Sequence, residues 1–409
     1  MTVRRTVLPD PTVFAAGSVA RLLSALNGDG EKTLVAGGAV RNAMIRHPIN
    51  DLDCATTALP HETIRRAERA GFRAVPTGIE HGTVTVLVDG HPFEVTTLRA
   101  DVATDGRRAV VSFGRDFAAD AARRDFTIKA LYADRDRTVI DHVGGLDDLA
   151  ARRVRFIGDA AARIREDYLR ILRLFRFFAR YAEGDIDAEA LSAAIRERDG
   201  LDILSRERIR VELLKILSAR RAVEAARIMG ETGFLSRVLG GVANHSRFEA
   251  GASAAGELSP AQRLGLLAVE CREDADRLRH RLALSNEEHE VLQRAAVLSA
   301  WLRSTRFSAS AHQMRALIYR LGADVGPMLA ASLTAAAAPA GAIADAGQVS
   351  SWTPPVLPWR GADALAAGVA AGPEVGTALK QAEQAWIEAD FPGDPAALAD
   401  IWSQALGHG

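Results

Sequence analysis

Two glycines and two aspartates within a short stretch of chain carry the first chemical signal. Gly37 and Gly38 follow apolar residues that read as a strand, and they precede a short helical pattern; Asp51 and Asp53 come next, on an expected second strand. Glycines let the backbone approach an anion closely, and a helix N-terminus offers N–H groups to phosphate. Alternate strand residues share a face, so both carboxylates should point the same way. Paired carboxylates beside an anion site suit Mg²⁺ and a nucleoside triphosphate, and the pattern predicts nucleotidyl transfer.

Each half of this pattern is weak by itself. The Asp-x-Asp spacing also begins at Asp134, Asp185 and Asp274, where solvated surface pairs are the expected explanation. A Gly-Gly pair forms a tight turn far more often than a phosphate site. The full order of strand, glycines, helix and strand with two aspartates is much rarer, and it favours the catalytic interpretation.

Glu94 is the candidate for a third carboxylate. It lies in an alternating stretch, residues 91–98, that follows a hairpin signal at Asp89 and Gly90. If this strand pairs beside the one that carries Asp53, Glu94 reaches the same metal ions. The alternative is a solvated glutamate on the strand surface.

A helical pattern over residues 162–182 carries the candidates for base selection. Its apolar stripe repeats at three- to four-residue spacing, and the other side presents Asp167, Arg170 and Arg173. Asp167 and Arg170 are three apart, so we expect them to be neighbours on one helical face. A carboxylate acceptor held beside a guanidinium donor reproduces the hydrogen-bonding edge of a base, which allows nucleotide selection without a template. The alternative is an ordinary intrahelical ion pair.

Positive charge is concentrated in the middle of a chain whose net charge is only -1. Residues 152–180 contain nine arginines against three acidic residues, and residues 205–221 contain five arginines and a lysine against two glutamates. This asymmetry indicates a surface that binds a polyphosphate or an RNA backbone. We assign Arg176, Arg208 and Arg210 to RNA binding, with a solvated helix face as the alternative for any single arginine.

Length and composition predict a globular protein of several domains. At 409 residues, of which 48% are hydrophobic and 25% charged, the chain is too long for one ordinary core, and two to four domains are expected. Cys54 and Cys271 are the only cysteines, which predicts no disulfide framework, no structural zinc and a cytoplasmic location. No signal peptide or membrane-spanning stretch is evident, and neither a membrane nor a protein partner is expected.

Hydrophobic periodicity predicts mixed α and β elements before residue 144 and helices after it. The expected strands are 33–36, 51–55, 82–88, 91–98 and 138–141. The expected helices in the same region are about 14–26, 39–46, 60–70 and roughly 117–131.

Seven motifs, taken in order and spacing, carry a resemblance to a known family. They are Gly-Gly-Ala-Val-Arg to Asp-Leu-Asp (37–53), Glu-Val-Thr-Thr-Leu-Arg (94–99), Arg-Arg-Asp-Phe-Thr-Ile-Lys-Ala-Leu (123–131), Gly-Gly-Leu-Asp-Asp-Leu (144–149), Arg-Phe-Ile-Gly-Asp (155–159), Glu-Asp-Tyr-Leu-Arg-Ile-Leu-Arg (166–173) and Glu-Arg-Ile-Arg-Val-Glu-Leu (207–213). Over about residues 30–215 the chain resembles the class II tRNA nucleotidyltransferase and bacterial poly(A) polymerase family.

The resemblance implies an α+β fold with a polymerase-β-like nucleotidyltransferase head on a mixed sheet, followed by helical parts. We expect the head over residues 1–143, a helical neck over 144–222, a body over 223–349 and a tail over 350–409. The resemblance also implies two Mg²⁺ ions at Asp51 and Asp53. The nucleotide-binding set that we predict is Gly37, Gly38, Arg41, Arg123, Asp125, Asp167, Arg170 and Arg173.

Two residues depart from the family pattern. Many members have Asp where this chain has Asn42, and Asn where it has Lys129, so the group available for a nearby sugar or phosphate contact differs. No His-Asp phosphohydrolase motif is visible, so we expect no phosphatase domain.

The choice of activity within the family depends on two segments and on the C-terminal charge. The polar residues 101–115 resemble the lid whose loss is associated with CC-only enzymes, and residues 361–386 resemble the tail of tRNA-processing members. A strongly basic C-terminus, expected of polyadenylating relatives, is missing. We therefore predict CCA addition to the 3′ end of tRNA from CTP and ATP. The alternatives are poly(A) synthesis, partial (A-only or CC-only) addition and, from a different class, a catalytically silent RNA-binding protein.

Overall fold

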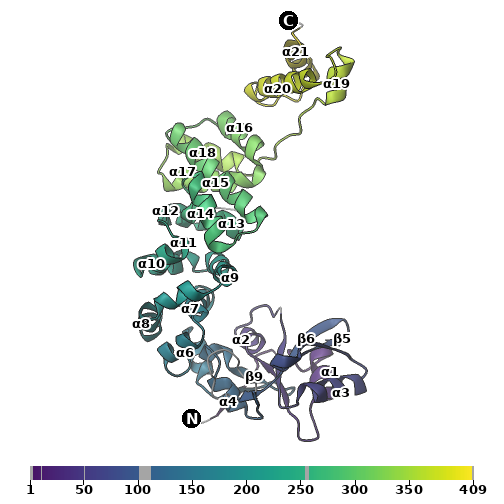
Figure 1. The fold of residues 1–409 in the computed structure, drawn as a ribbon, viewed down its shortest axis with the longest axis vertical. Coiled ribbons are helices and arrows are strands. Elements are labelled where there is room, and N and C mark those ends of the chain that lie inside the picture. The colour runs from purple at the N-terminus through teal and green to yellow at the C-terminus, as the bar shows by residue number, and fades with distance from the viewer. Residues whose placement is uncertain (1–2, 11, 50, 101–111, 254–257, 408–409) are drawn as a thin grey trace. The chain divides into compact units, whose positions relative to one another are not determined.

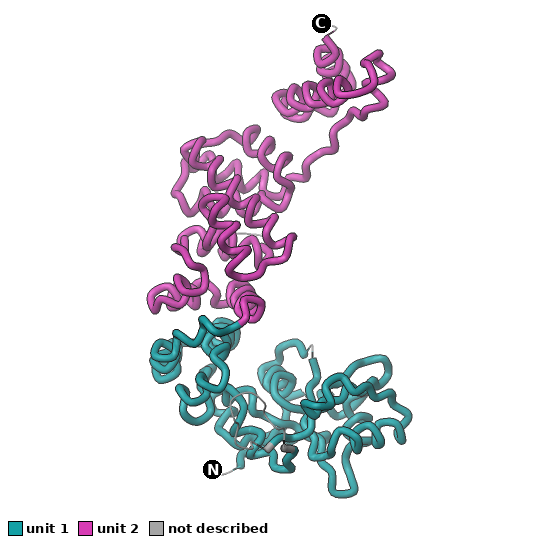
Figure 2. The backbone as a smooth tube through the Cα atoms, in the orientation of Figure 1, with its two compact units in different colours: residues 1–204 teal, residues 205–409 magenta. Residues whose placement is uncertain are grey.

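The computed structural model divides into two compact units, residues 1–204 and residues 205–409 (Figure 2). It describes residues 3–10, 12–49, 51–100, 112–253 and 258–407. The four predicted parts, with boundaries after residues 143, 222 and 349, stay predictions, and the unit boundary falls inside the predicted neck. Most of the predicted lid, residues 101–111, lies outside the described residues.

A mixed sheet forms the centre of the first unit, as predicted, and it has eight strands. Its strands are β1 (Arg4–Val7), β2 (Thr33–Ala36), β3 (Asp53–Thr56), β4 (Arg73–Gly78), β5 (Thr83–Val88), β6 (His91–Thr97), β9 (Leu131–Ala133) and β10 (Thr138–Asp141). Of these, β1, β4 and β9 were not predicted. The order across the sheet is β1-β10-β9-β2-β3-β6-β5-β4, and only β3 and β6 are parallel neighbours. Two short strands, β7 (Arg99–Ala100) and β8 (Ser112–Phe113), pair separately.

A tight hairpin joins β5 and β6 at the predicted place. Asp89 and Gly90 have φ of 54° and 80°, which a two-residue hairpin turn requires. Val88 therefore pairs directly with His91. This turn fixes the register of β6, the strand that carries Glu94.

Helices cover the sheet and extend the first unit. They are α1 (Gly17–Leu26), α2 (Gly38–Met44), α3 (Pro60–Arg69), α4 (Phe117–Ala122), α5 (Gly145–Ala150), α6 (Ala160–Glu166), α7 (Leu169–Tyr181) and α8 (Ala188–Arg196), with 3₁₀ turns η1 (Ile79–His81), η2 (Thr127–Lys129) and η3 (Arg198–Ile203). α1 and α3 lie side by side and both contact β5 (Figure 1). α2 contacts β2 and β9, which places the residues after Gly37 close to the middle of the sheet.

The single helix predicted over residues 162–182 is wrong. The structure has α6 and α7 instead, separated at Asp167, whose backbone is extended (φ −158°, ψ 104°). The Asp167 carboxylate accepts a hydrogen bond from the Leu169 N–H at 3.1 Å, which satisfies an amide at the start of α7. Aspartate favours such a position over a helix interior because its side chain competes for backbone hydrogen bonds.

The helix predicted roughly over residues 117–131 is also wrong. α4 ends at Ala122, and the chain then pairs with a later segment: the Thr127 N–H donates to the Arg155 carbonyl at 3.1 Å. Phe126 and Phe156 also pack together, with ring centroids 4.7 Å apart. These long-range contacts override local helix propensity.

In the described part of the second unit, every regular element is helical, as predicted. The elements are α9 (Arg206–Leu217), α10 (Ala222–Glu231), α11 (Phe234–Leu239), α12 (His245–Ser253), α13 (Pro260–Ala268), α14 (Arg272–Leu282), α15 (Asn286–Ser304), α16 (Ala311–Leu321), η4 (Ala323–Val325), α17 (Gly326–Ala335), α18 (Ala340–Val349), α19 (Gly361–Ala366), α20 (Pro373–Glu388) and α21 (Pro395–Ala405). Across the described ranges of both units, no helix combines the length and the apolar character needed to cross a bilayer.

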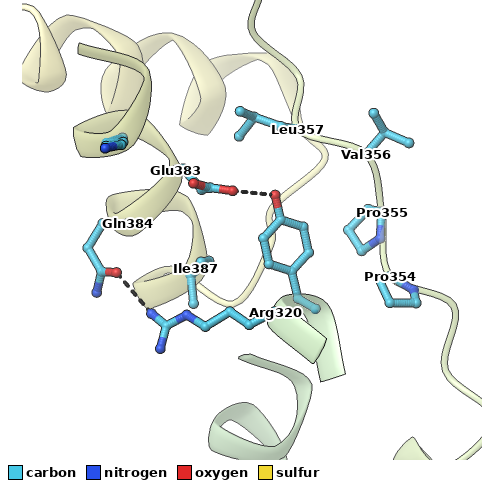
Figure 3. Close-up of a pocket in the computed structure, with 10 residues that line it drawn as sticks. Arg320, Pro354, Pro355, Val356, Leu357, Glu383, Gln384 and Ile387 are labelled. Carbon is cyan, nitrogen blue, oxygen red and sulfur yellow. Dashed lines mark hydrogen bonds between the residues drawn. The ribbon is translucent and has the colours of Figure 1, made fainter. Parts of the chain in front are cut away.

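Hydrogen bonds connect α16 to α20 beside the proline-rich residues 354–357 (Figure 3). The Tyr319 hydroxyl donates to Glu383 at 2.8 Å, and the Arg320 guanidinium donates to Gln384 at 3.0 Å. Because these partners satisfy one another, the contact is a structural one.

Candidate active site

Two acidic residues lie directly opposite each other across a parallel strand pair. β3 begins at Asp53, and the register pairs Asp53 with Glu94 of β6. The strand neighbours of Glu94, Phe93 and Val95, are buried, so Glu94 points to the opposite, open face. The predicted placement of Glu94 beside Asp53 is confirmed.

Asp51 joins these two residues in a cleft of about 610 Å³. Asp51, Asp53 and Glu94 line the cleft together with Ser18 and Thr85. Asp51 lies before the first residue of β3, not on the strand as predicted. The loop before β3, and not strand alternation, therefore brings Asp51 to the same cleft as Asp53.

The three carboxylates suit a divalent cation. Burial raises the pKa of Asp53, and the charge of Asp51 adds to this effect, whereas Lys129 and Arg124 oppose it. Among the described residues, no group of three or more Asp, Glu, His or Cys side chains is placed to hold a metal ion. Mg²⁺ commonly takes one or two carboxylates and completes its octahedron with substrate phosphates and water. The donor set fits an ion of this kind, and ligation by these residues stays a prediction.

The glycine turn, Gly37 and Gly38, lies against two cationic residues. A Cβ on Gly37 would lie 3.1 Å from Arg124 Nη1 and 3.4 Å from the Lys129 carbonyl oxygen, and Gly37 has a φ of +69°. The Gly37 N–H donates to the Leu131 carbonyl at 2.8 Å, so the fold already uses this amide. The first glycine therefore serves close approach, and the positive charge near the turn comes from side chains.

Four side chains supply this charge, and we call Arg41, Arg124, Lys129 and Arg173 the cationic cluster. Asp125 is held by Arg173, whose Nε donates to Asp125 Oδ2 at 2.8 Å, while Lys129 Nζ lies 3.8 Å from Asp125 Oδ1. Burial acts to raise the pKa of Asp125, but the charges of Lys129 and Arg173 outweigh burial and lower it. Asp125 thus stays ionised, and it balances only part of the charge of the two cations.

Asp120 orients both predicted and unpredicted arginines. Its buried carboxylate accepts from Arg124 Nη2 at 2.9 Å, from the Tyr132 hydroxyl at 2.6 Å and from Arg123. This arrangement directs Arg124 toward the glycine turn, where Nη1 donates to the Lys129 carbonyl at 3.2 Å. The sequence prediction named Arg123 and missed Arg124, although the two are adjacent in one motif.

Asp167 and Arg170 do not form the predicted pair on one continuous helix. Arg170 Nη1 donates to Glu166 Oε2 at 2.6 Å and to the Arg163 carbonyl at 2.8 Å. Asp167 lies at the break between α6 and α7 and accepts from the Leu169 N–H. Both residues remain near one another along the chain, and base selection by them stays a prediction.

The predicted RNA-binding arginines lie in both units. The Arg176 guanidinium lies 4.9 Å from the Phe177 ring centroid in α7, whereas Arg208 and Arg210 belong to α9. Arg210 donates to the Ala283 carbonyl, which connects α9 to the end of α14. RNA contact by these side chains stays a prediction.

Comparisons with known proteins agree with the fold and the motifs. A family model described as the poly A polymerase head domain matches residues 33–155, and one described as a probable RNA- and SrmB-binding site of polymerase A matches residues 185–245. CCA tRNA nucleotidyltransferase 1, mitochondrial, of Mus musculus is 34% identical over 364 residues, which cover 87% of this chain and 83% of that protein. A CCA-adding enzyme of Streptococcus gordonii is 42% identical over 224 residues, or 54% of this chain and 55% of that protein.

Solved structures give the same result for the architecture. The CCA-adding enzyme of Bacillus stearothermophilus in complex with CTP aligns with a TM-score of 0.69 at 26% identity, covering 95% of this chain and 96% of that chain. The Thermotoga maritima CCA-adding enzyme complexed with tRNA aligns with a TM-score of 0.72 over 99% of this chain and 100% of that one. At 18% identity, the second alignment shows a common fold alone.

Proposed function

The chain belongs to the family of class II CCA-adding tRNA nucleotidyltransferases, and we propose that it adds C, C and A to the 3′ end of tRNA from CTP and ATP. The observation that carries the proposal is the pairing of Asp53 with Glu94, in one cleft with Asp51 and close to the cationic cluster. Carboxylates for a cation and cations for a triphosphate are the two halves of a nucleotidyl-transfer site. The names of the relatives support CCA addition to tRNA, the CTP complex supports CTP as a substrate, and the terminal A requires ATP.

Asp51, Asp53 and Glu94 are the residues that would hold Mg²⁺. When bound, Mg²⁺ would activate the RNA 3′-hydroxyl and stabilise the departing pyrophosphate. The clustering of the three carboxylates in one solvent-accessible cleft supports this assignment.

In the reaction, the RNA 3′ oxygen bonds to the α-phosphorus, its proton passes to solvent, and the bond from the α-phosphorus to pyrophosphate breaks. The cationic cluster binds the triphosphate and stabilises the charge that develops on the leaving pyrophosphate. Because Gly37 has no side chain, the Arg124 guanidinium and the Lys129 carbonyl can lie close to the glycine turn. Asp125 holds Arg173 in place, and Asp120 holds Arg123 and Arg124.

Asp167 and Arg170 are proposed to select the base. Cytosine and adenine both present an exocyclic amino donor beside a ring-nitrogen acceptor on their pairing edge. A carboxylate that accepts from the amino group and a guanidinium that donates to the ring nitrogen suit both bases. Guanine and uracil present a carbonyl in place of the amino group, and the Asp167 carboxylate would repel it.

The basic residues are proposed to bind the tRNA backbone, with Arg176, Arg208 and Arg210 as contacts. We also propose a cytoplasmic location, which the two unpaired cysteines, Cys54 and Cys271, support.

The test compares Asp53→Ala with a matched control, Asp136→Ala, which removes an exposed aspartate from the Asp134–Asp136 pair in the β9–β10 turn. The assay is Mg²⁺-dependent incorporation of labelled CTP into tRNA that lacks its 3′ CCA. We expect Asp53→Ala to lower incorporation by more than about 100-fold. Such a loss exceeds the effect of removing a residue that only hydrogen-bonds to a metal ligand. tRNA binding, measured by gel shift, should be unchanged. Wild-type rates in Asp53→Ala would refute the carboxylate assignment, and no incorporation by the unmodified protein would refute the function.

A further inference from the structure

Arg41 is a buried cation for which the described residues provide no carboxylate partner. Its residue exposure is 5%, and its Nη2 lies 3.7 Å from where a Cβ on Gly38 would be. Among the residues that the structure describes, no carboxylate lies within ion-pair distance of its guanidinium, and none appears among the groups that shift its pKa. A buried charge without a counter-ion is destabilising, so the fold must hold Arg41 by other means.

Neutral groups provide the contacts that hold Arg41. Nη2 donates to the Tyr181 hydroxyl at 2.6 Å, and Nε and Nη2 donate to Asn42 Oδ1 at 3.1 and 2.9 Å. The guanidinium carbon lies 3.9 Å from the Tyr181 ring centroid and 5.5 Å from that of Phe177. A ring face and two neutral oxygens fix the orientation of a guanidinium, but they do not cancel its charge.

The surrounding charges make this imbalance larger. Burial, together with the charges of Arg180 and Arg176, lowers the pKa of Arg41 to about 10, although Tyr181 acts in the opposite direction. Arg41 in turn acts to lower the pKa of Lys129. Among the described residues, Arg41 thus has cationic neighbours and no carboxylate partner, and this arrangement favours an anion that arrives from outside the protein.

We propose that Tyr181 is a positioning residue for nucleotide binding, which holds Arg41 as a fixed positive charge behind the glycine turn so that the incoming triphosphate becomes its counter-ion. This proposal rests on the proposed function. Tyr181 is the last residue of α7, and the residues proposed to select the base lie just before and within the first turn of the same helix. Because the contact acts on phosphate charge and not on the base, its loss should affect CTP and ATP equally.

The first test uses Tyr181→Phe, which removes the hydroxyl and keeps the ring, and Tyr181→Leu, which removes both. For the Phe variant we expect the KM values of CTP and ATP to rise together by about 5- to 20-fold, with kcat within about twofold of wild type, because a hydrogen bond to a charged group is lost. The Leu variant should show a larger rise. The matched control is Tyr319→Phe, which removes a hydroxyl that donates to Glu383 at 2.8 Å in the second unit. Its KM values should equal those of wild type.

The second test measures phosphate binding without catalysis. Inorganic tripolyphosphate is titrated into the full chain by calorimetry, and we expect Tyr181→Phe to weaken its affinity by the same factor as the KM values. Unchanged KM and unchanged tripolyphosphate affinity in the Phe variant would overturn the proposal, as would a fall in kcat alone. If the unmodified protein transfers no nucleotide but the Phe variant still loses tripolyphosphate affinity, the proposed function fails while the role of Tyr181 stands. Because Tyr181→Phe is nearly isosteric, it decides the outcome even if Tyr181→Leu does not fold.

Discussion

Replacing Lys129 with methionine should weaken triphosphate binding and remove its pH dependence. The Lys129 side chain is 27% exposed, so a ligand can reach Nζ, which lies 3.8 Å from Asp125 Oδ1 and 5.5 Å from the Phe177 ring centroid. Asp125 is already bound by Arg173, so one carboxylate balances two cations. A phosphate oxygen would provide the missing negative charge.

The magnitude follows from the pKa of Lys129. Burial, with the charges of Arg173, Arg124 and Arg41, lowers this pKa to about 8, although Asp125 acts to raise it. Such a lowering from the ordinary value of 10.5 corresponds to about 3 kcal/mol against the charged form. Because the unfolded chain binds the proton more tightly, folding stability from this group should rise with pH between about 8 and 10.5. A bound triphosphate favours the charged lysine, so nucleotide affinity should change in the opposite sense and fall as pH rises through 8.

The assay is the KM of CTP at pH 7 and pH 9 in saturating Mg²⁺. For wild type we expect a rise of roughly tenfold, because a lysine with a pKa of about 8 goes from about nine-tenths to about one-tenth protonated. Lys129→Met should already show a KM about 10- to 100-fold above wild type at pH 7 and little further change. Lys380→Met, a lysine of the second unit, is the control and should follow the wild-type profile. If Lys129→Met and wild type show the same pH dependence, the reasoning about Lys129 is wrong.

Two further sets of substitutions test the glycine turn and the base selection. Gly37→Ala should lower the melting temperature and raise the KM of both nucleotides, since a positive φ and the 3.1 Å approach to Arg124 Nη1 together cost about 1–3 kcal/mol. The control is Gly71→Ala, because Gly71 has a φ of +80° but open space around its Cβ position. This variant should lower the melting temperature and leave the KM values unchanged. Asp167→Ala or Arg170→Ala should reduce the preference for CTP and ATP over GTP and UTP by about 10- to 100-fold in competition assays, while Mg²⁺-dependent transfer continues. Unchanged selectivity in both variants would refute base selection by these side chains.

The carboxylate site could be predicted from the sequence because local patterns determine it. The turn at Asp89 and Gly90 sets the register of β6, and alternation along β6 then places Glu94 on the open face. Its pairing with Asp53 followed from the assumption that the two strands are neighbours, which the sheet confirms. Asp51 lies in the predicted cleft, but it reaches the cleft from the loop before β3. The predicted cause, alternation of side chains along one strand, was wrong.

Arg41 and Arg173 were predicted as nucleotide-binding residues, but their grouping with Arg124 and Lys129 in the cationic cluster could not be predicted, because long-range contacts build it. The sequence analysis gave Tyr181 no role, and only the fold brings its hydroxyl to Arg41, 140 positions away in sequence. Arg124 and Lys129 were expected on one helix, but this segment pairs with residues 155–157, and the Arg124 guanidinium and the Lys129 carbonyl lie close to Gly37. The break between α6 and α7 at Asp167 was not predicted, because one aspartate within an otherwise regular apolar repeat has little effect on the hydrophobic periodicity.

The most direct test of the account is to sequence the 3′ ends made by the unmodified protein on tRNA that lacks its terminal CCA, with Mg²⁺ and with CTP and ATP supplied singly and together. If the protein adds CCA, CTP alone should give addition of two C residues. CTP and ATP together should give addition of C, C and then A, without further extension. Long A tracts with ATP alone would indicate a poly(A) polymerase, and addition that stops at CC, or that requires a CC end, would indicate a partial enzyme. Any of these products, or no product at all, would contradict the claim that the site reads both CTP and ATP and completes CCA.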